Sequence, residues 1–167
     1  MRRKDREMPR EFALSTADKC EYAVLSMTDT DSKPYSVPIS IARMENTIYF
    51  HCANTGKKLV CLRAHPQVCL VCVGDTHRMA HVFTTEFEST VIRGTASEVL
   101  QVQEKITALR LLCERHTPSN MPAFNREVKK HLAHTAVWKI EIESISGKQN
   151  KCDKNGREIK SGKISED

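Results

Sequence analysis

The sequence of 167 residues has no apolar run long enough to cross a bilayer, and its first ten residues lack the apolar core of a signal peptide. We therefore expect a cytoplasmic protein with no membrane partner. Hydrophobic residues make up 40% of the chain and charged residues 28%, which is ordinary for a globular protein. We expect one domain over residues 1–147, followed by a basic polar tail over residues 148–167.

A complete zinc motif is also missing. Cys69 and Cys72 have the spacing of a zinc knuckle, but no second CxxC or CxxH pair completes four ligands. Both lie in QVCLVCVG, which has the pattern of a strand, so their side chains should point to opposite faces. Seven cysteines without an export signal are best interpreted as reduced thiols, most of them buried, and no metal site is predicted.

The net charge of +5 does not predict a nucleic-acid-binding surface. Residues 1–10 carry five basic and two acidic side chains, and residues 147–167 carry six and four. The segment between them, 11–146, has fifteen of each sign. Because the excess positive charge lies in the terminal segments, we expect no nucleic-acid partner.

Alternation of apolar and polar residues predicts strands over much of the chain. Strands are expected in EYAVLSMTD, PYSVPISIAR, TIYFHC, QVCLVCVG, EFESTVIRGTASEVL and TAVWKIEIESI. The second and third should form a hairpin, and Gly94 should mark a bulge. Helical spacing occurs in EFALSTADKC, KKLVCLRA, QVQEKITALRLLCERH and TPSNMPAFNREVKKHL, the last capped by Ser119 or Asn120. The pattern predicts a mainly β fold, an antiparallel barrel carrying a few helices.

The turn after TIYFHC places Lys57 and Lys58 where a helix should begin. If Asn54 or Thr55 caps this helix, both cations lie at the end that already carries about half a positive charge. A bound anion would be attracted by the lysines, the free backbone N–H groups and the helix dipole together. The alternative is that both lysines extend into solvent at a cost of roughly a few tenths of a kcal/mol. The segment alone does not decide between these interpretations.

Several motifs together resemble a known family. They are DREM, PYSVPISI, IYFHCANTGKKL with LRAHPQVCLVCVGDT, FTTEFESTVIRGTA, ALRLLCERHTP and SISGK, in that order. From about Arg2 to Lys148 the chain resembles the pyridoxamine 5′-phosphate oxidase-like flavoproteins, and most of all their nitroimidazole-resistance branch. The resemblance implies a six-stranded antiparallel split barrel with peripheral helices, which forms a homodimer and holds FMN at the subunit interface.

The resemblance also implies which residues contact the cofactor. The segment matching Val37, Pro38, Ile39 and Ser40 would run beside the isoalloxazine ring, His51, Cys52, Lys57 and Lys58 would line the ribityl phosphate, and Ser89 would face the flavin from a later strand. The phosphate contacts coincide with the anion site suggested by the helix terminus.

Two departures from the family pattern concern the substrate. The chain lacks the basic Arg-x-His ending of pyridoxamine phosphate oxidases, which argues against pyridoxine or pyridoxamine phosphate. Glu86 and Phe87 stand where the nitroimidazole-resistance pattern has Asn and Tyr. A carboxylate close to a flavin phosphate would be unfavourable, so Glu86 should point away or the pocket should differ.

The function implied is that of an FMN-dependent oxidoreductase, similar to a nitroreductase, which passes electrons to a small nitro compound or quinone. NAD(P)H as donor would bind transiently over the flavin, because no glycine-rich dinucleotide motif is present. His51 is the candidate catalytic residue, since it could donate a proton or hydrogen bond to the acceptor; packing at the dimer seam is its alternative role. Two other functions stay open: a flavin-binding module without turnover, for storage, sensing or regulation, and a split-barrel haem protein with histidine axial ligands.

Overall fold

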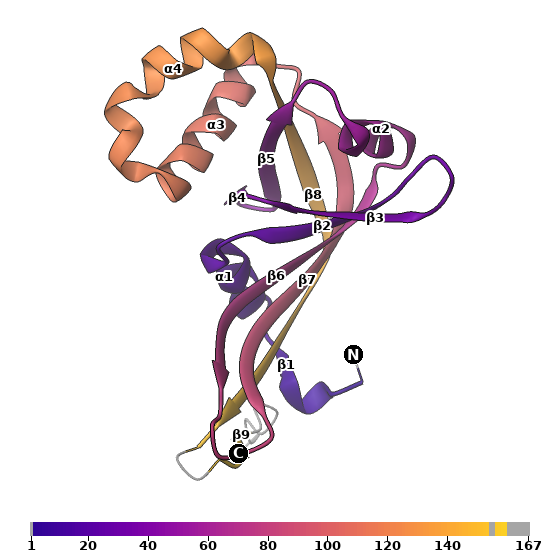
Figure 1. Ribbon diagram of the computed structural model, residues 1–167, viewed down its shortest axis with the longest axis vertical. Helices are drawn as coiled ribbons and strands as arrows, with labels where there is room; N and C mark the ends of the chain where they lie inside the picture. The colour runs from indigo at the N-terminus through magenta and orange to yellow at the C-terminus, as the bar shows by residue number, and fades with distance from the viewer. Residues whose placement is uncertain (1, 154–155, 160–167) are drawn as a thin grey trace.

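The computed structural model describes residues 2–153 and 156–159, and antiparallel strands dominate it (Figure 1). The strands are β1 (Glu7–Met8), β2 (Ala23–Thr28), β3 (Pro34–Ile39), β4 (Ala42–Met44), β5 (Thr47–Ala53), β6 (Gln67–Arg78), β7 (Thr85–Glu98), β8 (Thr135–Cys152) and β9 (Glu158–Ile159). The helices are α1 (Arg10–Lys19), α2 (Lys57–Ala64), α3 (Val102–His116) and α4 (Phe124–His131), with short 3-10 turns η1 (Lys4–Arg6), η2 (Pro118–Ala123) and η3 (Leu132–His134). The predicted mainly β fold is confirmed.

One curled sheet forms the body of the molecule. Its strands follow the order β3-β2-β6-β7-β8-β5-β4, and all pairs are antiparallel. The edge strands β3 and β4 are separated in sequence only by Ser40 and Ile41. The sheet must therefore curl until its two edges meet, which is the arrangement of a split barrel. The expected fold is confirmed, with nine strands instead of six because β1, β4 and β9 are short additional strands.

The inner face of the curled sheet holds the main core. Leu25, Phe50, Leu70, Ile92 and Ile140 are completely buried there. Helices α1 and α2 pack against strands of this barrel. Helix α3 instead covers the outer face of β5 and β8, where a second, smaller core forms. The outer face of β2, β6 and β7 has no such helix among the described elements.

The bulge predicted at Gly94 is confirmed. The pairing of β7 with β8 shifts between Arg93 and Gly94. A Cβ atom at Gly94 would lie 2.1 Å from the carbonyl oxygen of Glu141, far inside the van der Waals distance. Only glycine allows the two strands to approach so closely here.

The residues expected to cap two helices do not cap them in the structure. Helix α2 begins at Lys57 as expected, but its N-cap is Gly56, with φ of 129°, and neither Asn54 nor Thr55 caps it. The Asn54 amide instead donates a hydrogen bond to the carbonyl of Ala133, 2.9 Å away.

The expected caps of the last helix, Ser119 and Asn120, lie within the 3-10 turn η2 instead. Helix α4 begins only at Phe124. Pro118 and Pro122 both fall within η2, where they favour a tight turn before the helix.

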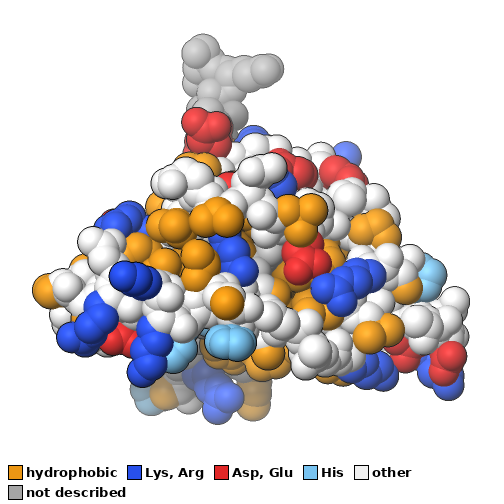
Figure 2. Space-filling view, turned by 90° about the horizontal axis from the view of Figure 1, so that it is seen from above, with side chains coloured by type: hydrophobic (Ala, Val, Ile, Leu, Met, Phe, Trp, Pro, Cys, Tyr) orange, Lys and Arg blue, Asp and Glu red, His pale blue; other side chains and the backbone are white. Residues whose placement is uncertain are grey.

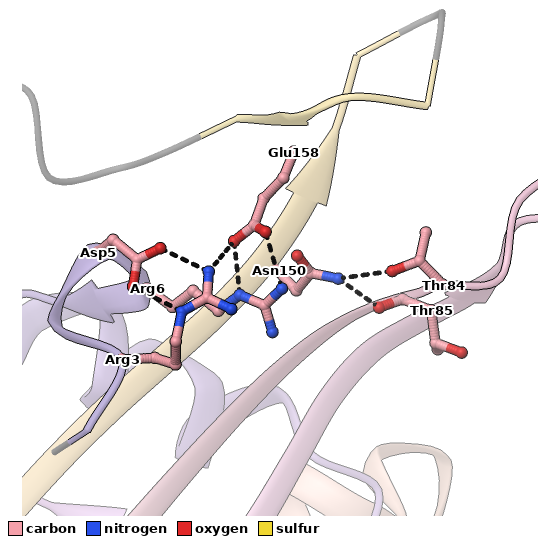
Figure 3. Close-up of polar contacts among 7 residues, drawn as sticks. All are labelled: Arg3, Asp5, Arg6, Thr84, Thr85, Asn150 and Glu158. Atoms are coloured by element: carbon pink, nitrogen blue, oxygen red, sulfur yellow. Dashed lines mark hydrogen bonds and ion pairs between the residues drawn. The ribbon is translucent and has the colours of Figure 1, made fainter.

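Strands β6, β7 and β8 continue beyond the barrel as a long arm, in the lower half of Figure 1. Strand β8 runs to Cys152 and so passes through the expected boundary at residues 147–148. Arg3 and Arg6 both bind the carboxylate of Glu158, with Nη2 to oxygen distances of 2.9 and 2.8 Å (Figure 3). These ion pairs hold η1 against β9. The expected tail residues 154–155 and 160–167 lie outside the described part of the chain.

No helix within the described residues is long and apolar enough to cross a membrane.

Candidate functional site

The N-terminus of α2 brings together two cations with different surroundings. The ammonium nitrogen of Lys57 lies 3.2 Å from Oδ2 of Asp29 and 4.8 Å from the ring centre of Tyr35. That of Lys58 lies 5.4 Å from the ring centre of Phe50. Lys58 forms no ion pair with any described residue. Its charge is therefore the one available for an external anion.

Asp29 is a part of this site that the sequence analysis missed. It follows β2, and its Oδ1 accepts the backbone N–H groups of Asp31 and Lys33, at 3.0 and 2.9 Å. The hydrogen bond from Lys33, with help from Lys57, lowers the pKa of the Asp29 carboxyl group. The segment TDTDSKP is typical of a turn, and nothing in it reveals that the turn faces α2.

The backbone of α2 is open to an anion. No side chain caps its first turn, so its first N–H groups lack the partner that a capping residue would provide. A Cβ atom added at Gly56 would meet nothing within 4 Å. Free N–H groups, open space and the charge of Lys58 fit a phosphate group at this position.

The segment Val37–Ser40 lies at an edge of the sheet. Along β3 and just after it, the side chains of Pro38 and Ser40 are exposed, whereas Val37 and Ile39 turn toward the core. A flat ring beside this edge would therefore meet the Pro38 and Ser40 side chains and the backbone of the other two residues.

His51 lies next to Ser40. In the β4–β5 hairpin, Ala42 pairs with Tyr49 and Met44 with Thr47, and the same register continued places Ser40 opposite His51. Both residues line one pocket. Desolvation lowers the pKa of His51, and the nearby charges of Lys58 and His116 act in the same direction. The His51 imidazole is therefore neutral at pH 7.

Cys52 points away from this site. It alternates with His51 along β5 and packs against the main core beside Phe50. Burial raises the pKa of its thiol. The backbone of Cys52 can contact a ligand, but its sulfur is directed inward.

A pocket of about 690 Å³ lies between β5 and a lobe formed by α3, η2 and α4, called the α3–α4 lobe below. Figure 2 shows hydrophobic side chains gathered on this side of the molecule, with Lys, Arg and His side chains at their margin. Leu109, Leu112 and Cys113 line the pocket, although the sequence indicates only a helical pattern there. Their helical spacing alone could not distinguish a stripe that packs on a sheet from one that also faces a pocket.

Ser89 is not brought to this site within one chain. It pairs with Lys148, whereas His51 pairs with Val137, eleven positions earlier on β8. At 3.3 Å per residue the two positions are about 35 Å apart along the strand, more than the length of FMN. Ser89 lies instead on the outer face of β7, half-buried.

Glu86 and Phe87 lie on the arm near the end of β8. Oε1 of Glu86 accepts the backbone N–H of Cys152 at 2.8 Å, so its carboxylate is held against β8. The ammonium of Lys148 lies 5.5 Å from the ring centre of Phe87.

The two cysteines of the CLVC motif point to opposite faces of β6, as expected, with Cys72 completely buried and Cys69 half-buried. The neighbouring thiol of Cys72, followed by the charge of Arg115, lowers the pKa of Cys20 to about 7. Among the described residues, no three His, Cys, Asp or Glu side chains gather in a way that could hold a metal ion.

The fold and the arrangement at its edge define a split-barrel protein. Residues 10–149 match the family model described as pyridoxamine 5′-phosphate oxidase. The chain belongs to this family. No curated protein matches the sequence.

Solved structures share this fold at low sequence identity. A candidate 5-nitroimidazole antibiotic resistance protein from Bacteroides thetaiotaomicron is 21% identical, with a TM-score of 0.71 and 86% of each chain covered. The FAD and haem binding protein from Mycobacterium smegmatis is 19% identical, with a TM-score of 0.69 over 87% of this chain and 73% of that one. An FAD-binding protein from Mesorhizobium loti is 18% identical, with a TM-score of 0.64 over 87% and 98%.

Proposed function

We propose that the protein binds a flavin nucleotide, FMN, between two copies of the chain and acts as an oxidoreductase on a small nitro compound or quinone. The observation that carries the proposal is the uncapped N-terminus of α2 with its uncompensated Lys58, close to the edge formed by Ser40 and His51. Two structural neighbours are FAD-binding proteins, which supports a flavin as the class of ligand.

A site built from two chains is supported by the position of Ser89. One flavin cannot touch both Ser89 and His51 of the same chain, given the separation along β8. The outer face of the sheet also carries an uncovered apolar row, in which Pro38, Val24, Val71 and Val91 pair across four strands. Pro38 and Val91 are exposed. A second copy covering this row would bury apolar surface and bring its own Ser89 towards the flavin.

Bound flavin supplies the redox chemistry, and the protein supplies position and electrostatics. Lys58 and the first N–H groups of α2 would hold the phosphate. The backbone of Val37 and Ile39 would flank the ring. His51, neutral at pH 7, would offer one ring nitrogen as a hydrogen-bond donor to the acceptor.

The visible spectrum of the purified protein, with the released chromophore identified by mass, tests flavin binding. A yellow protein containing FMN is expected, and a colourless protein that takes up neither FMN nor FAD would refute the proposal. Substituting both Lys57→Ala and Lys58→Ala should weaken FMN binding strongly and in a salt-sensitive way, because the phosphate is close to a dianion.

Turnover is tested separately. Reduced nicotinamide should bleach the bound flavin, and a nitroaromatic or quinone should restore its colour faster than it reoxidises free FMN. Bound flavin that reoxidises no faster than free FMN would identify a flavin-binding module without turnover.

Haem binding is the second candidate. His51, His116 and His131 all line the largely apolar pocket, and imidazole is a common axial ligand of haem iron. A neighbour described as an FAD and haem binding protein supports this candidate. A Soret band in the purified or haem-titrated protein that disappears in His51→Ala would favour it. Its absence after titration would exclude it.

A further inference from the structure

The pocket between β5 and the α3–α4 lobe has room for a ligand in addition to a phosphate-bound cofactor. Its volume of about 690 Å³ lies in the range of pockets that hold drug-sized molecules. Its walls come from Leu112 on α3 and from Phe124, Val128 and Leu132 on or beside α4. A ligand with a single small ring would leave much of this apolar wall exposed to water.

The pocket is electrically balanced. Apart from histidines, the described residues that line it include two charged side chains, Arg126 and Glu127. These form an ion pair with an Nε to Oε1 distance of 3.0 Å, and both are well exposed at the rim. A charged ligand would therefore lose its hydration without gaining an unpaired partner of opposite charge. Because the two charged side chains of the pocket neutralise each other, the pocket favours a neutral ligand.

Two polar side chains of the pocket lie at the end next to the sheet. Ser40 and His51 both reach this end from neighbouring strands. His116 also lines the pocket, but its Nε2 is already 2.8 Å from the carbonyl oxygen of Ile41. His51 and Ser40 are thus two groups that can hydrogen-bond a ligand at this end.

We propose that this pocket binds a neutral, flat molecule of two or more fused rings, with an oxygen acceptor directed at His51 and its apolar rings against Leu112, Phe124 and Val128. A naphthoquinone has this chemistry. The proposal rests on the proposed function only for the ligand's role as electron acceptor, because binding itself requires no flavin.

The test compares two probes of nearly equal size on protein freed of any cofactor, by isothermal titration. Dimethylnaphthoquinone is neutral, and its methyl groups block both ring carbons that would otherwise react with thiols such as Cys113. The second probe, 2-hydroxy-3-methyl-1,4-naphthoquinone, carries an ionised ring hydroxyl in place of one methyl group. We expect the neutral probe to bind at least about tenfold more tightly at pH 8. Equal affinities, or tighter binding of the anion, would overturn the proposal.

Variants locate the binding site. Val128→Trp fills the pocket and should weaken the neutral probe by at least about tenfold, whereas Val60→Trp on the exposed face of α2 should not. His51→Leu removes the hydrogen bond and should cost about fivefold, with recovery in His51→Gln. Unchanged affinity in both Val128→Trp and His51→Leu would place the probe elsewhere and refute the site.

Repeating the titration with FMN present separates this inference from the proposed function. Naphthoquinone binding without any FMN binding would support the pocket and contradict the proposed function. Retained binding in the presence of bound FMN would support both. Loss of naphthoquinone binding once FMN is bound would assign the pocket to the flavin ring and overturn the proposal.

Discussion

The ammonium group of Lys57 lies 3.2 Å from the carboxylate of Asp29, whereas the neighbouring Lys58 has no acidic partner among the described residues. The two lysines at the start of α2 are therefore not equivalent. Lys57 ties the turn after β2 to the helix, and Lys58 keeps its charge for a ligand. The sequence does not distinguish the two lysines. They differ in the structure because Asp29, almost thirty positions earlier, forms an ion pair with Lys57 and not with Lys58.

Lys58→Ala should weaken FMN binding more than Lys57→Ala does. Removal of Lys58 deletes an uncompensated charge beside the phosphate, and a loss of about tenfold or more is expected at low salt. Removal of Lys57 leaves the Asp29 carboxylate without its cation, so part of its effect should appear in stability. FMN titration at two salt concentrations measures the first effect, and urea denaturation the second.

Lys129→Ala, on the surface of α4, is the matched control for loss of one positive charge. Suppose that Lys57→Ala weakened FMN binding more than Lys58→Ala and left the stability of the protein unchanged. The assignment of Lys58 to the phosphate and Lys57 to Asp29 would then be wrong.

A mixed dimer tests whether one flavin is shared between chains. Lys58→Ala and Ser89→Glu should each abolish or strongly reduce FMN binding in a homodimer. In a mixed dimer of the two variants, one composite site keeps both native residues and the other loses both. We expect FMN binding at about half of the wild-type stoichiometry, measured on tagged, co-purified dimers. If each site lay within one chain, both chains of the mixed dimer would carry a damaged site. A mixed dimer that binds no FMN would therefore contradict the two-chain model.

An antiparallel barrel could be predicted from the sequence because most of its strands alternate apolar and polar residues, and the split-barrel type was implied by the family resemblance. Gly94 and the KKLVCLRA helix lie where the pattern placed them. The division of PYSVPISIAR into β3 and β4 could not be predicted. At Ser40 and Ile41 the chain passes from one edge of the sheet to the other and closes the barrel. The local alternation of apolar and polar residues carries no information about this step.

The candidate site was predictable only in part, for a similar reason. His51, Ser40 and the α2 lysines are close in sequence, so their proximity follows from one hairpin and one turn. Asp29 and the α3–α4 wall of the pocket reach the site through the tertiary fold. In the sequence, Asp29 is explained by a turn and the apolar residues of α3 and α4 are explained by packing. Nothing in the pattern shows that these residues also contribute to a site.

Gly94→Ala should destabilise the protein by about 3 kcal/mol, because the new methyl group would overlap the carbonyl oxygen of Glu141 and force β7 and β8 apart. Ser97→Ala, at an exposed position on the same strand, should change stability by less than about 0.5 kcal/mol. Chemical denaturation of both variants measures the difference. Equal stabilities would mean that the bulge tolerates a side chain by a shift of β8.

Tyr49 should make the protein sensitive to alkaline pH. Its ring is buried under α3, and its hydroxyl donates to Oε1 of Glu104 at 3.2 Å, an oxygen that also accepts a hydrogen bond from Lys139 at 2.8 Å. Desolvation, with the charge of Glu104 next, raises the pKa of Tyr49 to about 12, compared with about 10 in an unfolded chain.

Between these two pKa values the unfolded chain ionises Tyr49 and the folded protein does not. Stability should therefore be unaffected below pH 10 and fall between pH 10 and pH 12, by about 2 kcal/mol from this group. Tyr49→Phe should lose about 1 kcal/mol at pH 7 through the missing hydrogen bond, and it should show a shallower decline above pH 10. Tyr22→Phe, where the ring is exposed, should keep the wild-type decline. Urea denaturation at pH 9 and at pH 11.5 compares the three proteins, and parallel declines in wild type and Tyr49→Phe would show that Tyr49 does not hold its proton in the folded state.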